Sequence, residues 1–72
     1  MTNKHLWKVT VVQPSTRLEN IYKMTEKSAK PDFTKLGERT LKIAVNDKDA
    51  WNFNGILVLR VTSINYEGTI DG

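Results

Sequence analysis

The clearest alternation of apolar and polar residues lies near the amino terminus. From Leu6 to Gln13, large apolar residues stand at positions 7, 9 and 11, with the polar Lys8 and Thr10 between them. Successive side chains of a strand point to opposite faces, so this pattern predicts a half-buried β-strand. Pro14 cannot donate a backbone hydrogen bond to a neighbouring strand, and we expect the strand to end there.

The next segment carries two competing patterns. The Thr-x-x-Glu motif at 16–19 has the spacing of a helix capping box. Apolar or small residues follow at the spacing of one helix face, so the pattern favours a helix over residues 16–28. The alternative is a strand over residues 20–26 with Tyr22 and Met24 pointing inward.

A proline and a second alternating run follow. The residue before Pro31 is disfavoured in a helix, and we expect a loop that lasts until Glu38. From Thr40 to Val45, apolar residues again alternate with other residues, which predicts a second strand. The polar run 46–49 is either a connecting turn or a bulged bend in one long hairpin arm.

An Asn-Gly pair at 54–55, flanked by apolar residues, is the strongest local signal in the chain. Such a pair is typical of a two-residue β-hairpin turn. The register that follows forms five pairs: Phe53 with Ile56, Trp51 with Val58, Asp49 with Arg60, Val45 with Ile64, and Ile43 with Tyr66. Residues 56–61 are apolar on both faces, which predicts a strand covered on both sides. The tail after Gly68 is expected to fray or to form an edge.

These elements predict a small α+β domain. We expect a twisted antiparallel sheet of three to four strands with one helix packed on one face, or a small all-β barrel if residues 20–26 are extended. The 72 residues form a single small binding-type domain, 1–72, near the lower size at which an apolar core alone stabilises a fold.

Composition excludes several classes of protein. The chain has no cysteine, which excludes disulfides and thiolate metal sites, and its one histidine excludes a histidine-rich site. The longest apolar run, 56–59, is far shorter than the roughly 20 residues of a membrane span. The amino terminus lacks the apolar region of a secretory signal, so we expect a cytoplasmic protein without membrane contact.

The basic residues are concentrated in the first part of the chain. The formal net charge is +3, and residues 1–42 carry nine Lys or Arg against four Asp or Glu. If residues 16–28 form a helix, Lys23, Lys27 and Lys30 would line one side of it at positions i, i+4 and i+7. Such a strip is usually a solvated face, but it can also follow the phosphates of a nucleic acid. The residues of this alternative are Lys23, Lys27, Lys30, Lys35, Arg39 and Lys42.

The residues that could support catalysis or metal binding are sparse. His5 has no acidic partner nearby in the sequence and is expected at the surface. Asp47 and Asp49 resemble the start of a calcium loop, but the later ligand positions hold Trp51 and Val58. No glycine-rich phosphate loop is present. We therefore expect no enzyme activity, no metal and no cofactor.

Two large aromatic residues lie close together in a polar setting. Trp51 and Phe53 would either cover one end of the core or form an exposed contact for a protein. We expect a small non-catalytic regulatory module, an inhibitor or adaptor, that binds a larger protein through these two residues with Lys23 and Lys27. A component of a nucleic-acid-processing complex is one such partner. The alternative is modest, largely sequence-independent binding of DNA or RNA.

Overall fold

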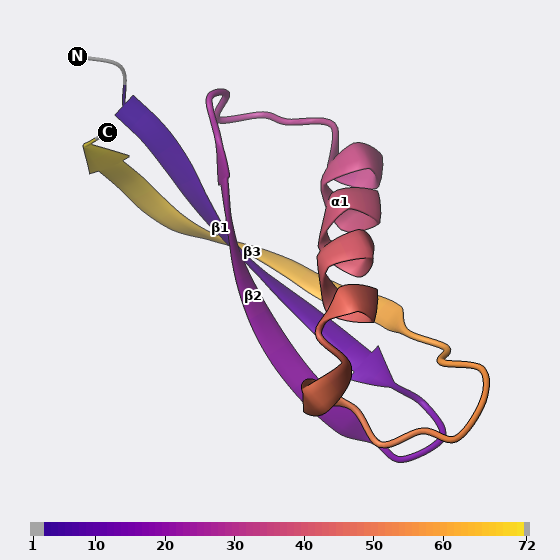
Figure 1. The fold of residues 1–72 in the computed structure, drawn as a ribbon. Coiled ribbons are helices and arrows are strands. Elements are labelled where there is room, and N and C mark those ends of the chain that lie inside the picture. The colour runs from indigo at the N-terminus through magenta and orange to yellow at the C-terminus, as the bar shows by residue number, and fades with distance from the viewer. Residues whose placement is uncertain (1–2, 72) are drawn as a thin grey trace.

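The central strand of the sheet is β1 (Asn3–Gln13), in a computed structural model that describes residues 3–71. It pairs antiparallel with β2 (Leu18–Glu26) on one side and β3 (Arg60–Asp71) on the other. One helix, α1 (Phe33–Asn46), packs on one face of this open sheet, and the short 3-10 helix η1 (Lys48–Ala50) follows it (Figure 1). The predicted α+β class is confirmed, and the barrel alternative is wrong.

The first strand forms where the alternation predicts it. Trp7, Val9 and Val11 are buried and form the centre of the apolar core. The strand ends at Gln13, directly before Pro14, as the missing amide hydrogen of proline requires. Since β1 lies between two strands, its apolar face receives side chains from both neighbours and from α1 above.

The predicted helix over 16–28 is wrong, and the alternative strand is correct. Each residue of β2 pairs with one of β1, with Met24 opposite Trp7 and Tyr22 opposite Val9. This pairing buries Met24 against the core, which a solvent-exposed helix turn would not achieve. The first two residues of the capping motif lie in the tight turn at 14–17 and the last two lie in β2. Thr16 donates its hydroxyl to the Gln13 side chain at 2.8 Å.

The helix lies further along the chain, in a region predicted as a loop and a strand. The loop ends at Asp32 instead of Glu38, and the strand over 40–45 is wrong, because α1 extends from Phe33 to Asn46. Its buried residues are Leu36, Thr40 and Ala44, which recur every four positions and so share one helix face. The Thr40 hydroxyl donates to the Leu36 carbonyl at 2.8 Å, so this polar group is satisfied inside the core.

The predicted hairpin at 54–55 is also wrong. Residues 51–59 form a loop between η1 and β3, and only Gly55, with φ of +99°, shows the left-handed backbone of the expected turn. Tyr66 lies opposite Trp7 and Ile64 opposite Val9, so β3 pairs with the first strand of the chain. The predicted register, which paired these two residues with positions 43 and 45, does not form.

The last strand forms one edge of the sheet. β3 continues to Asp71, so the tail is a paired edge strand as far as the structure describes it. Its register against β1 shifts twice, between Leu6 and Trp7 and between Thr10 and Val11. None of the helices within residues 3–71 has both the length and the apolar character needed to cross a bilayer.

Candidate binding surfaces

The structure separates the two aromatic residues proposed as a contact. Trp51 is only 6% exposed and belongs to the core, with its indole Nε1 donating to the Ala44 carbonyl at 3.0 Å. Phe53, two residues later, is 36% exposed. The interpretation of Trp51 as a core residue is confirmed, and Trp51 is not available to a partner. Phe53 remains as a surface residue.

Three hydrogen bonds that involve side-chain amides hold the chain at the start of the 51–59 loop. The Asn20 side chain donates to the Ala50 carbonyl at 3.1 Å, and the Gln13 side chain donates to the Asn52 carbonyl at 2.8 Å. The Asn52 amide donates back to Gln13 Oε1 at 3.2 Å. These bonds attach the loop to β1 and β2, so its conformation is set by the sheet and not by a hairpin of its own.

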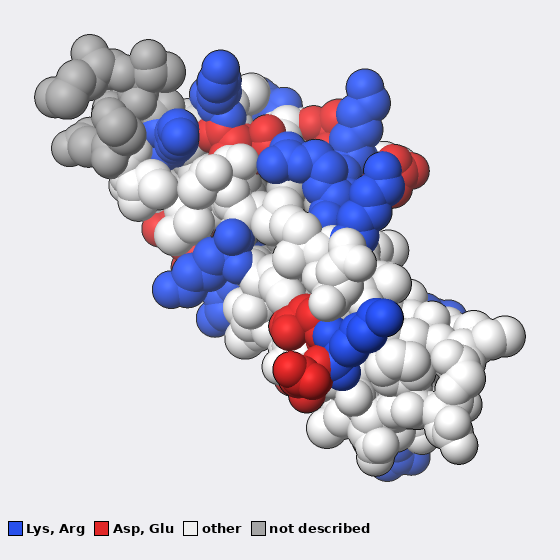
Figure 2. Space-filling view, viewed as in Figure 1, with Lys and Arg blue, Asp and Glu red and all other residues white. Residues whose placement is uncertain are grey.

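The far end of the loop is anchored by apolar packing. Leu57 and Leu59 pack against the core, while the residues between and before them point to solvent: Ile56 is 89% exposed and Val58 is 63% exposed. We call Phe53, Ile56 and Val58 the apolar loop surface. In Figure 2 the corresponding end of the molecule, where the 51–59 loop lies in Figure 1, is largely free of charged side chains. Phe53 was predicted as a contact from the sequence, whereas Ile56 and Val58 were not, because all four residues 56–59 are apolar and predict a strand covered on both sides.

The predicted basic strip is distributed differently from the expectation. Lys23 lies on β2 between two inward-facing residues and therefore points to the uncovered face of the sheet. Lys27 and Lys30 lie in the loop before α1. The stripe that does form lies on α1, because Lys35, Arg39 and Lys42 occupy positions i, i+4 and i+7 of this helix.

A hollow of about 510 Å³ lies between the end of β2 and the start of α1, and several of its lining residues are basic. Figure 2 shows basic side chains gathered at this end of the molecule. We call this site the basic hollow. Its lining residues are Lys4, Thr25, Glu26, Lys27, Ser28, Pro31, Asp32, Lys35 and Arg39. It therefore brings together three of the predicted basic residues and adds Lys4, which the sequence did not single out.

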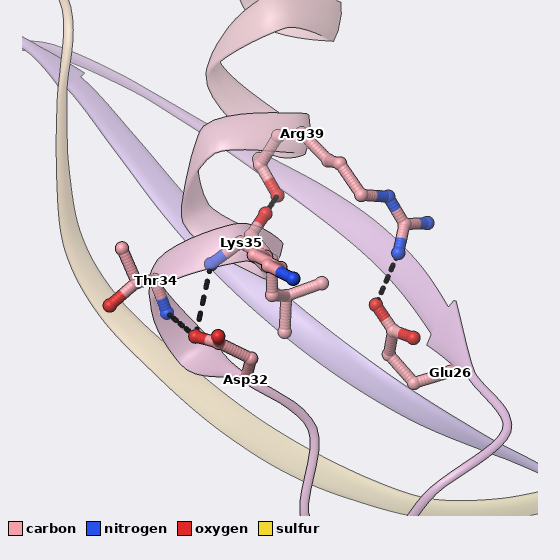
Figure 3. Close-up of polar contacts among 7 residues, drawn as sticks. Glu26, Asp32, Thr34, Lys35 and Arg39 are labelled. Atoms are coloured by element: carbon pink, nitrogen blue, oxygen red, sulfur yellow. Dashed lines mark hydrogen bonds and ion pairs between the residues drawn. The ribbon is translucent and has the colours of Figure 1, made fainter.

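The two acidic residues of the hollow are engaged within the protein (Figure 3). Glu26 forms an ion pair with Arg39. Asp32 is the N-cap of α1 and accepts from the amides of Thr34 at 3.0 Å and Lys35 at 3.3 Å. Within residues 3–71 neither Lys27 nor Lys35 takes part in an ion pair. The hollow therefore offers cationic groups, whereas its carboxylates already have partners.

Four aromatic rings lie close to one another near the same end of the sheet. The ring centroids of Trp7 lie 5.1 Å from Phe33 and 4.8 Å from Tyr66, and Tyr66 lies 5.8 Å from His5. His5 Nδ1 and the Tyr66 hydroxyl form a hydrogen bond of 2.8 Å. In the described part of the chain this is the one side-chain hydrogen bond of His5, and it involves no acid and no nucleophilic serine.

Of the two aspartates considered for calcium, Asp47 has a structural contact. Asp47 Oδ2 accepts a hydrogen bond of 3.0 Å from the Tyr22 hydroxyl, which connects β2 to the end of α1. Burial, followed by this hydrogen bond and the negative charge of Asp47, raises the pKa of Tyr22 above its ordinary value. Among the described residues, no group of three or more His, Cys, Asp or Glu side chains is placed to hold a metal ion.

Comparison of the chain with models of protein families, with curated proteins and with solved structures gives no match. Two surfaces of the molecule therefore remain as candidate binding sites. One is the apolar loop surface, and the other is the basic hollow with the neighbouring stripe on α1.

Proposed function

We propose that this chain is a non-catalytic regulatory module that binds and modulates a larger protein in the cytoplasm, and that the apolar loop surface is its main contact. The observation that supports this proposal most strongly is the exposure of Ile56 and Val58 on a loop that is attached at both ends. Three large apolar side chains, Phe53, Ile56 and Val58, are exposed within six residues of one loop, which favours a protein-binding site.

The energetics of such a contact are favourable. Covering one large aliphatic side chain contributes about 1.5–3 kcal/mol, and Ile56 and Val58 are both available for this. A loop that is already held by Gln13 and Asn20 loses little further freedom when it binds, so less of this free energy is spent on ordering. The contact is therefore preorganised.

The size of a stable interface requires more than the loop alone. A standard interface covers about 800 Å² of each partner, which is roughly 15% of the 5212 Å² surface of this chain. The turn at 14–17 lies next to the loop, because Gln13 at the end of β1 binds Asn52 directly. The turn and the apolar loop surface together form one end of the molecule, and we propose that this end enters the interface.

The proposal is tested by affinity capture with the purified chain as bait, from nuclease-treated extract of its native cells. The test variant replaces Ile56 and Val58 by serine. The matched control replaces Ile43 and Val45 by serine, two half-exposed apolar residues on α1. We expect the wild type and the control to retain the same proteins and the loop variant to lose them. Circular dichroism confirms that both variants are folded.

Two results would overturn this assignment of the contact. One is capture that is unchanged by the loop substitutions, and the other is capture that is lost in the α1 control alone. The second result would transfer the contact to the apolar residues of the helix.

A second candidate function, nucleic-acid binding, is supported by the stripe of Lys35, Arg39 and Lys42 on α1. Cations at this spacing can contact successive phosphates, and binding of this kind weakens steeply as salt rises. The test is fluorescence anisotropy with a single-stranded oligonucleotide at increasing salt, for the wild type and Lys42→Gln. Binding that is absent at low salt would eliminate this candidate.

A further inference from the structure

We propose that the basic hollow is a binding site for a compact ligand that carries one or more phosphoryl groups. The site lies between the end of β2 and the start of α1, whereas the apolar loop surface lies beyond the other end of the helix (Figure 1). The inference therefore does not depend on the proposed protein partner.

The charge of the hollow favours a multiply charged anion. Its lining residues include four cations, Lys4, Lys27, Lys35 and Arg39, against two carboxylates, which gives a formal charge of +2. A phosphoryl group carries about −1.5 to −2 charge and three acceptor oxygens in a small volume. One such group can therefore neutralise the hollow, whereas a single carboxylate supplies only one negative charge.

Among residues 3–71, the ion pairs around the hollow leave Lys27 and Lys35 free for a ligand. Asp32 directs one oxygen to the two backbone amides at the start of α1, so these amides are occupied and recognition must come from side chains. Lys35 stands in the first turn of α1, at the positive end of the helix dipole, and the first turn itself contains no acidic residue beyond the Asp32 cap. An anion bound beside Lys35 would also interact favourably with this end of the helix.

The dimensions of the hollow fit a small molecule. Ligand pockets typically measure about 300–1,000 Å³, and the hollow, at about 510 Å³, falls within this range. Its cations come from three parts of the fold: Lys4 from β1, Lys27 from the loop, and Lys35 with Arg39 from α1. Lysines are charges on flexible stems, so they can adjust to the several oxygens of an oligophosphate.

Isothermal titration calorimetry with sodium tripolyphosphate at about 0.15 M salt tests this proposal. We expect saturable binding of one molecule per chain. The double variant Lys27→Gln with Lys35→Gln should bind at least about tenfold more weakly, because two charge-assisted hydrogen bonds are lost. The matched control, Lys23→Gln with Lys48→Gln, removes the same charge from exposed residues outside the hollow and should change the affinity less than about twofold.

Three outcomes would overturn the proposal: no saturable binding, equal weakening by both double variants, or tighter binding of a single-stranded oligonucleotide that Lys42→Gln weakens as strongly as the hollow variant does. The last outcome would indicate a nucleic-acid track along α1. Failure of this proposal is distinguishable from failure of the proposed function, because capture of a protein partner depends on Ile56 and Val58 and not on Lys27 and Lys35.

Discussion

The side-chain amide of Gln13 forms two hydrogen bonds with the backbone of Asn52, one as donor at 2.8 Å and one as acceptor at 3.2 Å. The two residues are 39 positions apart in the sequence, and the Gln13 side chain is only 2% exposed. A buried amide that satisfies both its donor and its acceptor in this way specifies one position for the loop relative to β1. The presentation of the apolar loop surface therefore depends on a polar residue in the core.

Removal of this amide should destabilise the fold. Gln13→Ala leaves a cavity and removes the side-chain partner of both backbone groups of Asn52, so we expect a loss of about 2–3 kcal/mol in the free energy of unfolding. Urea denaturation measures this loss. Asn54→Ala, at an exposed position of the same loop, is the control and should change stability by less than about 0.5 kcal/mol. Equal effects of the two substitutions would contradict the role of Gln13.

Substitution of Trp51 should affect folding before it affects binding. Trp51→Ala removes a buried indole at a cost of about 3–5 kcal/mol, which is comparable to the total stability of a domain of this size. Trp51→Phe keeps most of the packing and loses the bond to the Ala44 carbonyl, at about 1–2 kcal/mol. Thermal unfolding followed by circular dichroism should give the highest unfolding temperature for the wild type, a lower one for Trp51→Phe and the lowest for Trp51→Ala. A well-folded Trp51→Ala variant would refute the placement of Trp51 in the core.

The stability of the protein should fall at alkaline pH through Tyr22. Burial and the bond to Asp47 raise the pKa of Tyr22 above 10.0 in the folded state, so the neutral phenol stabilises the fold. This contribution is fully present below the unfolded pKa of about 10 and is lost as the pH rises through the higher folded value. Denaturant unfolding at about pH 8 and about pH 10.5 should show a steeper decline for the wild type than for Tyr22→Phe. Parallel declines would show that Tyr22 is not responsible.

The ion pair between Glu26 and Arg39 should limit anion binding in the hollow. Glu26→Gln releases the guanidinium for a ligand, and we expect tripolyphosphate to bind about fivefold more tightly. Because the pair is partly exposed, the fold should lose no more than about 1 kcal/mol. Glu38→Gln changes the net charge equally but lies outside the hollow, so its effect on affinity should be clearly smaller. The same gain in both variants would indicate net charge alone.

Two glycines should respond to alanine in opposite directions. Gly55 has φ of +99°, a conformation that side chains rarely adopt, so Gly55→Ala should cost about 1–2 kcal/mol. Gly37 lies inside α1, and an added methyl group would meet only Val61 Cγ2 at an ordinary distance of 3.9 Å. Gly37→Ala should therefore stabilise the protein by about 0.5–1 kcal/mol. Chemical denaturation of both variants measures the difference, and a stabilising effect of Gly55→Ala would contradict the loop geometry.

β1 was predicted correctly because the residues that alternate in its sequence are the ones that the fold buries. In β1, the alternation at Trp7, Val9 and Val11 gives the strand its buried face, and Pro14 ends it. In β2 the sequence pattern and the fold disagree. Leu18, Ile21 and Thr25 have the spacing of one helix face. Pairing with β1, however, buries Met24 and half-buries Tyr22, and this burial of apolar surface decides the conformation.

The helix was missed because its buried face is not strongly apolar. The face of α1 that meets the sheet contains Leu36, Thr40 and Ala44, of which one is polar and one is small. The larger apolar residues Ile43 and Val45 are exposed, and they produced a false alternation. A better signal was present in Asp32, which precedes the helix as an N-cap residue directly after a proline.

The candidate surfaces were only partly readable from the sequence. The basic residues could be counted, but the hollow forms because α1 brings Lys35 and Arg39 against the end of β2 and the loop with Lys27, and this depends on the fold. The Asn-Gly pair predicted a chain reversal that requires strands on both sides of it. Trp51 instead enters the core beneath α1, so the segment before the pair does not become a strand.

The two register shifts in β3 have a consequence for how copies of this protein meet. A second molecule could extend the sheet at β3 only if the outer edge of this strand offered evenly spaced amides and carbonyls over several residues. Irregularities of this kind interrupt that spacing and increase the local twist, which discourages edge-to-edge association. The β3 edge is therefore a poor template for fibrous growth.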